Sequence, residues 1–270
     1  MISAAKAVKF AFRCSVFVCT GNILVRCASS SSNIMQTLRT DGLGGRGITF
    51  VPRSGEYTNL LVWMHGLGDT ADGWASLMPQ LQLAAAANTK IVLPTAPDRP
   101  ISLNGGYEMP GWSDIYGLGE KDPEDRKGFD ESAERVNAIV QQEIDQHGVS
   151  PSRVVLAGFS QGGAVALHTA LRSPHKLGGV IALSSWLPLR ADYPAQLSST
   201  AASSLPVLQV HGDADMVVSY EWGKQSNAML KNLLQAAPTP PAFHTIQGMG
   251  HSSDPEEIAL VKSFLNSIFK

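Results

Sequence analysis

The chain has 270 residues, and its 21 basic and 23 acidic residues leave a formal net charge of −2. This balance lacks the basic footprint of a nucleic-acid-binding protein, and no apolar run is long enough to span a bilayer as a helix. All three cysteines, Cys14, Cys19 and Cys27, lie near the N-terminus. The rest of the chain therefore has neither a disulfide framework nor a cysteine metal site.

The first forty residues form a basic leader. All the Lys and Arg residues in it precede the first acidic residue, Asp41, and Ser29–Ser32 are consecutive serines. That composition is typical of a mitochondrial or plastid transit peptide. Two other interpretations stay open, namely translation that starts at Met35 and a disordered tail acylated at its cysteines. We expect residues 1–40 to be a targeting or disordered segment and residues 41–270 to form one domain.

Apolar runs of strand length alternate with helix-like segments through the rest of the chain. Near-continuous apolar runs such as Asn59–Met64 are typical of strands that are covered on both faces. The predicted fold class is α/β, with a mostly parallel central sheet and helices on both faces. Strands are predicted at 48–52, 59–64, 90–94, 154–158, 178–183, 205–210 and 242–246, and helices at 74–87, 129–147, 164–171, 220–234 and 255–269.

Residues 95–128 interrupt this alternation, because they are rich in proline, glycine and aromatic residues and are expected to have no regular structure. A long excursion of this kind in a compact domain is usually functional. Since small-ligand pockets are mostly apolar and aromatic, we predict that residues 97–119 form a lid or groove wall and that Met109, Trp112 and Leu118 bind substrate. The alternative is an ordered surface loop whose aromatic side chains pack into the core.

The segment Gly158-Phe159-Ser160-Gln161-Gly162 fits the pattern G-x-S-x-G between a predicted strand and a predicted helix. In that context the serine lies on a tight turn with its hydroxyl exposed above the sheet. The N-terminus of the helix that follows favours developing negative charge. Ser160 is therefore the predicted nucleophile. The alternative is a glycine-rich turn whose serine caps the helix.

A serine hydroxyl needs a base to take its proton, usually a histidine that a carboxylate holds in one tautomer. In α/β-hydrolases the chain order is serine, then acid, then histidine. His251 follows the last predicted strand and fits the position of the base. Asp213 and Asp215 both follow the preceding strand, and their positions alone leave the choice of acid open.

An acyl-transfer site also needs N–H donors for the oxyanion that forms on the substrate. We expect one donor to be the backbone N–H of Gln161, which follows the nucleophile. The other is expected in the loop after the early strand 59–64, at Leu67. His65, in the same loop, is expected to brace it.

Six motifs occur in a fixed order: His65-Gly66-Leu67-Gly68-Asp69, Ala96-Pro97 with Asn104-Gly105-Gly106, Met109 and Trp112, Gly158-Phe159-Ser160-Gln161-Gly162-Gly163, His211-Gly212-Asp213-Ala214-Asp215 and Gly250-His251. From about residue 46 to the end, the chain resembles the acyl-protein thioesterase and phospholipase/carboxylesterase family of α/β-hydrolases. The resemblance implies that Asp215 is the acid of a triad with Ser160 and His251, and that Leu67 and Gln161 donate to the oxyanion. It implies no metal or cofactor.

The resemblance implies a serine hydrolase that cleaves palmitoyl thioesters on S-acylated proteins, with transient contact to a membrane surface and a cytoplasmic location, or an organellar one if the leader is a transit peptide. The alternatives are a carboxylesterase, deacetylase or lysophospholipase that acts on oxyesters, and a binder of hydrophobic ligands without turnover. Two positions depart from the family pattern: Met216 stands where Asp-Pro often precedes the paired valines, and Ser113 stands where an aromatic residue often follows the lid tryptophan. The second departure concerns the preference for acyl chains, because position 113 is expected near the groove.

Overall fold

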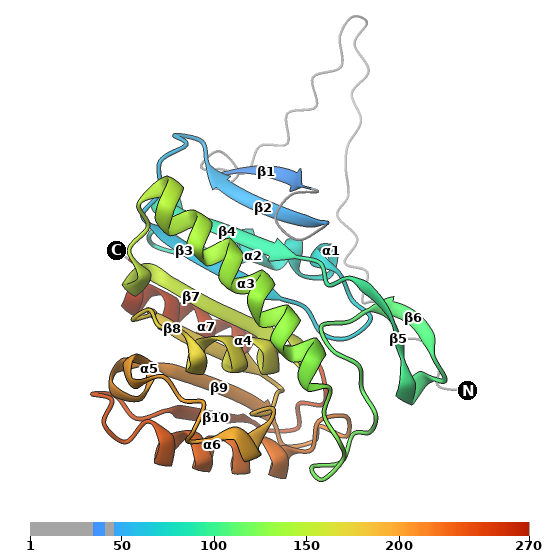
Figure 1. Ribbon diagram of the computed structural model, residues 1–270. Coiled ribbons are helices and arrows are strands. Elements are labelled where there is room, and N and C mark those ends of the chain that lie inside the picture. Colours follow the sequence, from blue (N-terminus) through green and yellow to red (C-terminus); the bar gives the residue numbers. More distant parts are fainter. Residues whose placement is uncertain (1–34, 41–45, 270) are drawn as a thin grey trace, which may run out of the picture. The chain divides into compact units, whose positions relative to one another are not determined.

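The computed structural model describes residues 35–40 and 46–269. This part of the chain forms an eight-stranded sheet with the order β1-β2-β4-β3-β7-β8-β9-β10 (Figure 1). Strands β1, β2 and β4 pair antiparallel, and every pair from β4 to β10 is parallel. The strands are β1 (Met35–Thr40), β2 (Gly47–Pro52), β3 (Asn59–Met64), β4 (Thr89–Pro94), β7 (Val154–Phe159), β8 (Gly179–Leu183), β9 (Val207–Gly212) and β10 (Ala242–Ile246).

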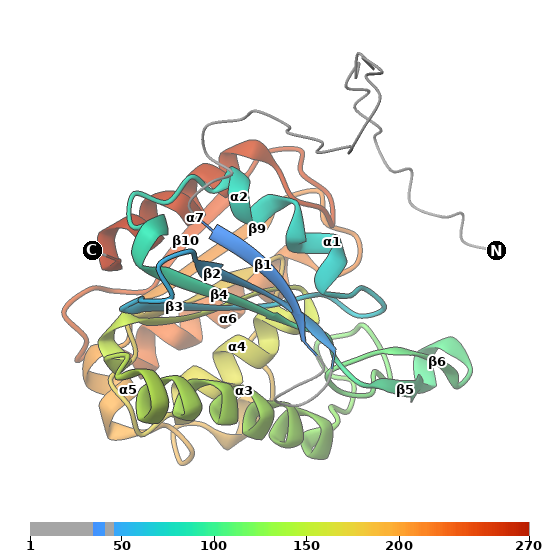
Figure 2. The ribbon, with the colours of Figure 1, turned by 90° about the horizontal axis from the view of Figure 1, so that it is seen from above.

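Helices cover both faces of the sheet (Figure 2). One face carries α3 (Arg126–His147), α4 (Gln161–Arg172), α5 (Ser199–Ser204) and α6 (Tyr220–Leu233), and the other carries α1 (Ala71–Ala75), α2 (Leu77–Gln80) and α7 (Pro255–Ile268). Side chains of a strand alternate between the two faces, so Leu60 and Val62 of β3 enter the core under α3 and α4, while Leu61 and Trp63 enter the opposite core. The predicted mostly parallel sheet with helices on both faces is confirmed.

The predicted helix 74–87 is wrong in its extent, because two short helices, α1 and α2, stand in its place and α2 ends at Gln80. The first helix begins before Trp74, since the hydroxyl of Thr70 accepts a hydrogen bond from the N–H of Asp72 and caps it. Pro79 has no N–H to donate and is tolerated only in the first turn of a helix. It therefore lies in the first turn of the new helix α2.

The expectation that residues 95–128 have no regular structure is also wrong. They contain the antiparallel hairpin of β5 (Asp98–Ile101) and β6 (Tyr107–Pro110), which projects from one end of the large sheet (Figure 1). The turn of the hairpin passes through Gly105 and Gly106, whose φ angles are +66° and +83°. Consecutive residues with positive φ favour glycine and are typical of a tight hairpin turn.

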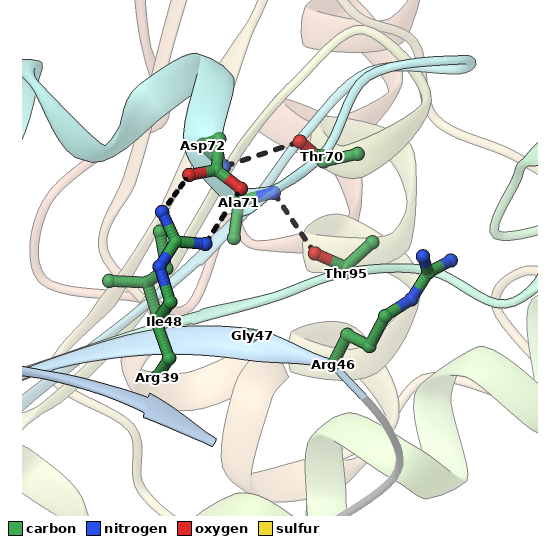
Figure 3. A pocket seen from close by; sticks show the side chains of 8 residues that line it. All are labelled: Arg39, Arg46, Gly47, Ile48, Thr70, Ala71, Asp72 and Thr95. Atoms are coloured by element: carbon green, nitrogen blue, oxygen red, sulfur yellow. Dashed lines mark hydrogen bonds and ion pairs between the residues drawn. The ribbon is translucent and has the colours of Figure 1, made fainter. Parts of the chain in front are cut away.

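Strand β1 lies within residues 1–40, which the sequence analysis places outside the fold. It pairs with β2 along its whole length, and Arg39 forms a two-point ion pair with Asp72 of α1 at 2.5 and 3.1 Å (Figure 3). Residues Met35–Thr40 therefore belong to the same sheet as the domain expected from residue 41. Residues 1–34, the rest of the predicted leader, lie outside the described residues.

Glu257 in the first turn of α7 is fully buried. Burial, together with the nearby charge of Asp254, raises the pKa of Glu257 to about 8. The folded chain then binds the proton of Glu257 more tightly than the unfolded chain does. The contribution of this proton to the free energy of unfolding is complete below the pKa of the unfolded chain and is lost as the pH rises to about 8.

We expect Glu257→Gln, which stays uncharged, to remove this part of the pH dependence of stability. The melting temperature of the wild-type protein should fall relative to that of the variant between pH about 4.5 and about 8. Thermal unfolding of both proteins across this range checks the prediction, and parallel curves would contradict it.

Candidate active site

Ser160 is the single residue between β7 and α4, and its backbone is strained. Its φ of 53° and ψ of −121° lie in a region that side-chain-bearing residues avoid. The N–H of Ser160 donates to the carbonyl of Leu183 at 2.8 Å. Its carbonyl accepts hydrogen bonds from the N–H groups of Gly163 and Ala164 and from the hydroxyl of Ser185, the last at 2.7 Å. These contacts hold the strained turn between the end of β8 and the start of α4.

Two glycines allow the turn to be this tight. A Cβ on Gly158 would lie 2.3 Å from the carbonyl carbon of Gly162, and a Cβ on Gly162 would lie 2.3 Å from the carbonyl oxygen of Met64. Neither position has room for a side chain, because α4 begins directly against the ends of β7 and β3. The spacing of the G-x-S-x-G pattern thus reflects the close approach of three backbone segments.

Asp215 lies in the loop after β9 with its side chain fully buried. Its Oδ1 accepts hydrogen bonds from the N–H groups of Val217 and Val218 at 2.8 and 3.0 Å. Burial by itself raises the pKa of Asp215, but donors that include His211, His251 and Val217 outweigh burial and hold the pKa below its ordinary value. The carboxylate is therefore ionised at neutral pH.

His251 lies in the loop after β10, and its Nδ1 is 2.8 Å from Oδ2 of Asp215. The other candidate acid, Asp213, is exposed and instead accepts a hydrogen bond from the N–H of Gly248. The ring of His251 packs against Phe159, with 4.7 Å between centroids. Of the two aspartates that the sequence offers, the fold brings Asp215 to this histidine.

Ser160 and His251 line the same cavity. The hydrogen bonds of the described residues do not include one between the Ser160 hydroxyl and His251. Catalytic hydrogen bonds are often long in structures without substrate and shorten when substrate binds. His251 is thus hydrogen-bonded to Asp215, and it lines the same cavity as Ser160.

Leu67 and Gln161, the predicted oxyanion donors, both line this cavity. Within the described chain, no acceptor is recorded for the backbone N–H of either residue. The N–H of Gln161 is the first of α4, where the helix itself provides no partner. Both groups are thus free to donate to a bound oxyanion.

His65 braces the loop that carries Leu67. The N–H of Ala96 donates to its Nε2 at 2.9 Å, so the ring proton lies on Nδ1, which donates to the carbonyl of Gly66 at 2.6 Å. The indole N–H of Trp112 donates to the carbonyl of His65 at 2.8 Å. Burial lowers the pKa of His65, which keeps the ring neutral and able to accept from Ala96. These contacts agree with the bracing role expected for this histidine.

The cavity has a volume of about 290 Å³ and a largely aromatic and aliphatic wall. Of the three residues predicted to bind substrate, Leu118 lines it, whereas Met109 and Trp112 do not. Trp112 is fully buried behind the wall, bonded to His65, and a role in binding for it and Met109 stays a prediction. Ile115 of the predicted groove wall 97–119 also lines the cavity, but the sequence analysis missed the rest of the wall: Trp74, Phe159, Trp186, Val217, Val218 and Trp222.

The side chain of Gln161 ties the nucleophile turn to the predicted lid. Its Oε1 accepts from the N–H of Trp112 at 2.9 Å, and its Nε2 donates to the carbonyl and the hydroxyl of Ser113 at 2.8 and 3.0 Å. Ser113 is fully buried and does not line the cavity. The serine at this position therefore serves the contact with Gln161, and any effect on the acyl chain is indirect.

A second cavity of about 280 Å³ lies between β2 and α1 (Figure 3). Two arginines line it, and each has a carboxylate partner: Arg39 pairs with Asp72, and Arg46 pairs with Asp98 at 2.9 Å. Their charges are compensated by the chain itself. Across residues 35–40 and 46–269, no group of three or more His, Cys, Asp or Glu side chains is placed to hold a metal ion. In the same ranges no helix has the length and apolar character to cross a membrane.

A serine on a strained turn above a mostly parallel sheet, with a histidine and a buried aspartate beside it, defines an α/β-hydrolase. Residues 48–269 match the model of the phospholipase/carboxylesterase family. The chain belongs to this family and is a hydrolase.

Curated relatives and solved structures agree with this assignment. The chain is 40% identical to acyl-protein thioesterase 1 of Mycosarcoma maydis over 227 residues, which are 80% of this chain and 94% of that protein. It is 42% identical to acyl-protein thioesterase 1 of Gibberella zeae, over 79% of this chain and 92% of that protein. The structure of Arabidopsis thaliana SOBER1 is similar, with a TM-score of 0.72, 31% identity and coverage of 78% and 99% of the two chains. Zea mays acyl-protein thioesterase 2 has a TM-score of 0.70, 30% identity and coverage of 87% and 99%.

Proposed function

We propose that this protein hydrolyses acyl thioesters on S-acylated proteins through a covalent acyl-enzyme on Ser160. The observation that carries the proposal is the 2.8 Å contact between His251 and the buried Asp215, beside a cavity that also contains Ser160. The relatives named acyl-protein thioesterase support the class of substrate.

In the first step the Ser160 hydroxyl attacks the thioester carbonyl while His251 Nε2 takes its proton. Asp215 accepts the Nδ1–H of His251, which leaves Nε2 free to act as the base, and stabilises the imidazolium that forms. The free N–H groups of Leu67 and Gln161 are the donors for the tetrahedral oxyanion. His251 then gives the proton to the leaving thiol, and water hydrolyses the acyl-enzyme by the same steps.

The apolar wall of the cavity suits the acyl chain of the substrate. Trp186 and Trp222 stack at 4.8 Å and, with Val217 and Leu118, form a surface on which a fatty chain could lie. Each methylene buried there contributes up to about 0.8 kcal/mol of binding free energy, or roughly fourfold in kcat/KM. A long acyl chain is thus a better substrate than a short one, as long as it fits the groove.

An acyl-length series on matched thioesters and oxyesters tests the proposal. We expect kcat/KM to rise with chain length from acetyl toward palmitoyl on thioesters. Rates that fall beyond short chains, or that are higher on oxyesters, would instead favour a carboxylesterase, deacetylase or lysophospholipase. A folded protein that a fluorophosphonate does not label would favour a binder without turnover.

A pair of leucine variants serves as the control for the groove. Leu118→Ser, in the cavity wall, should lower kcat/KM on long chains by about fivefold while leaving acetyl esters unchanged, because roughly 1 kcal/mol of apolar contact is lost. Leu103→Ser changes a leucine of similar exposure, 43% against 47%, that lies outside the cavity wall. Equal effects of the two variants would contradict the proposed groove.

The proposal places the enzyme in the cytoplasm, with transient contact to membrane surfaces where its acylated substrates lie. An organellar location applies if the leader is a transit peptide. N-terminal sequencing of the native protein decides between these locations.

A further inference from the structure

A second histidine lies against the carboxylate of Asp215. His211, near the end of β9, is buried, and its Nε2 lies 3.4 Å from Oδ2 of Asp215 and 2.9 Å from the carbonyl oxygen of Val218. A carbonyl oxygen can only accept, so the proton of His211 lies on Nε2. The same N–H faces Asp215, whose two oxygens are thus surrounded by four N–H groups, from Val217, Val218, His251 and His211.

The ring of His211 is held on several sides. Phe243 of β10 stacks on it at 6.5 Å, and Tyr220, the titratable residue that α6 presents to it, meets it edge-on at 6.1 Å. Helix α6 passes so close at Gly223 that a Cβ there would lie 2.4 Å from Nδ1 of His211. The imidazole therefore has little freedom to turn, and its Nε2–H stays directed at the loop after β9.

This loop carries Asp215 and ends where Val217 and Val218 enter the cavity wall. By bonding to the carbonyl of Val218, His211 closes the loop across its base. A carboxylate with donors at both oxygens cannot rotate without breaking several contacts. Since Asp215 sets the tautomer of His251, its orientation is passed on to the base.

We propose that His211 is a positioning residue of the hydrolase site: its Nε2–H fixes the loop and the carboxylate of Asp215, and through them the ring of His251. The inference rests on the proposed function, because it assigns a role within that site. His211 does not contact the substrate, so its loss should affect kcat more than KM.

The test compares His211→Phe, which keeps a flat ring without the N–H, with His211→Gln, whose amide can donate from a similar place. We expect His211→Phe to lower kcat on a short ester at least about tenfold, with KM within about twofold. Losses of this size are found in metal sites when a residue that orients a histidine through a hydrogen bond is replaced. His211→Gln should recover most of the loss. Wild-type kcat in His211→Phe, or equal loss in both variants, would overturn the proposal.

Two further variants keep the test decisive if His211→Phe does not fold. Gly223→Ala keeps the imidazole of His211 but places a Cβ against it, which displaces the ring and should also lower kcat. His244→Phe, at an exposed histidine of β10, makes the same exchange outside the site and should retain kcat. A normal kcat in Gly223→Ala, or an equal loss of kcat in His244→Phe, would overturn the proposal.

Failure of this inference and failure of the proposed function give different results. If the wild-type protein hydrolyses no ester or thioester, or if Ser160→Ala is as active as the wild type, the proposed function fails. If the wild type is active and depends on Ser160 while the His211 and Gly223 variants match it, only the positioning role fails.

Discussion

Ser160→Ala is expected to abolish hydrolysis of acyl esters and thioesters while the protein stays folded. The loss in kcat should approach about 10⁶-fold, the size found when the serine of a comparable triad is removed. The reason is that no other described side chain in the cavity combines a hydroxyl with a neighbouring histidine and acid. Steady-state kinetics on a p-nitrophenyl ester and labelling by a fluorophosphonate measure the effect.

A second substitution at the same position separates catalysis from backbone strain. Ser160→Gly should be equally inactive but more stable by about 1 kcal/mol, because glycine adopts the φ of 53° with much less strain. Melting temperatures of the wild type and the two variants test this. Turnover in either variant far above about 10⁻⁶ of the wild-type kcat would point to another nucleophile.

Asp215→Asn is expected to lower kcat by about 10⁴-fold with little change in KM. The amide can donate to Nδ1 of His251, which leaves the histidine with its proton on Nε2 and unable to act as the base. The substitution also replaces one of the two acceptor oxygens of the carboxylate by an NH₂ group, so the contacts from Val217, Val218 and His211 cannot all be kept. Steady-state kinetics of the variant and the wild type on the same ester measure the loss.

Asp213→Asn is the matched control for this variant, because both aspartates lie in the loop after β9. Asp213 is exposed, and its side chain accepts a hydrogen bond from the N–H of Gly248, so its replacement should change kcat less than about threefold, as expected for a surface substitution. A larger loss in Asp213→Asn than in Asp215→Asn would reverse the assignment of the acid.

Local sequence patterns were enough to predict most of the strands and helices and the candidate reacting groups. The pattern around Ser160 requires glycines wherever backbones nearly touch, and the structure has such contacts at Gly158 and Gly162. Burial leaves a distinct pattern of apolar residues in the sequence. Burial on one face predicted the helix around Val136 and Val140, and burial on both faces predicted the strand Asn59–Met64.

The segment 95–128 shows where pattern reading failed. The turn at Gly105 and Gly106 is a hairpin signal, but the flanking strands Asp98–Ile101 and Tyr107–Pro110 contain prolines and exposed residues that hide the alternation. The helix expected at 74–87 failed because the chain breaks at Ser76 and Pro79 lies in the first turn of a second short helix that ends at Gln80. Local propensity gives little guidance for elements as short as these.

The sequence by itself determined the fold class, the serine turn and the short set of residues from which a triad could be chosen, because these depend on contacts between near neighbours in the chain. The family resemblance already implied Asp215 as the acid, although its position alone left the choice from Asp213 open. Only the tertiary structure decided that Trp186 and Trp222 form the cavity wall with Leu118 and that His211 lies behind the acid. Such contacts join the ends of separate strands and loops. They depend on how parallel strands align at one edge of the sheet, which no local pattern records.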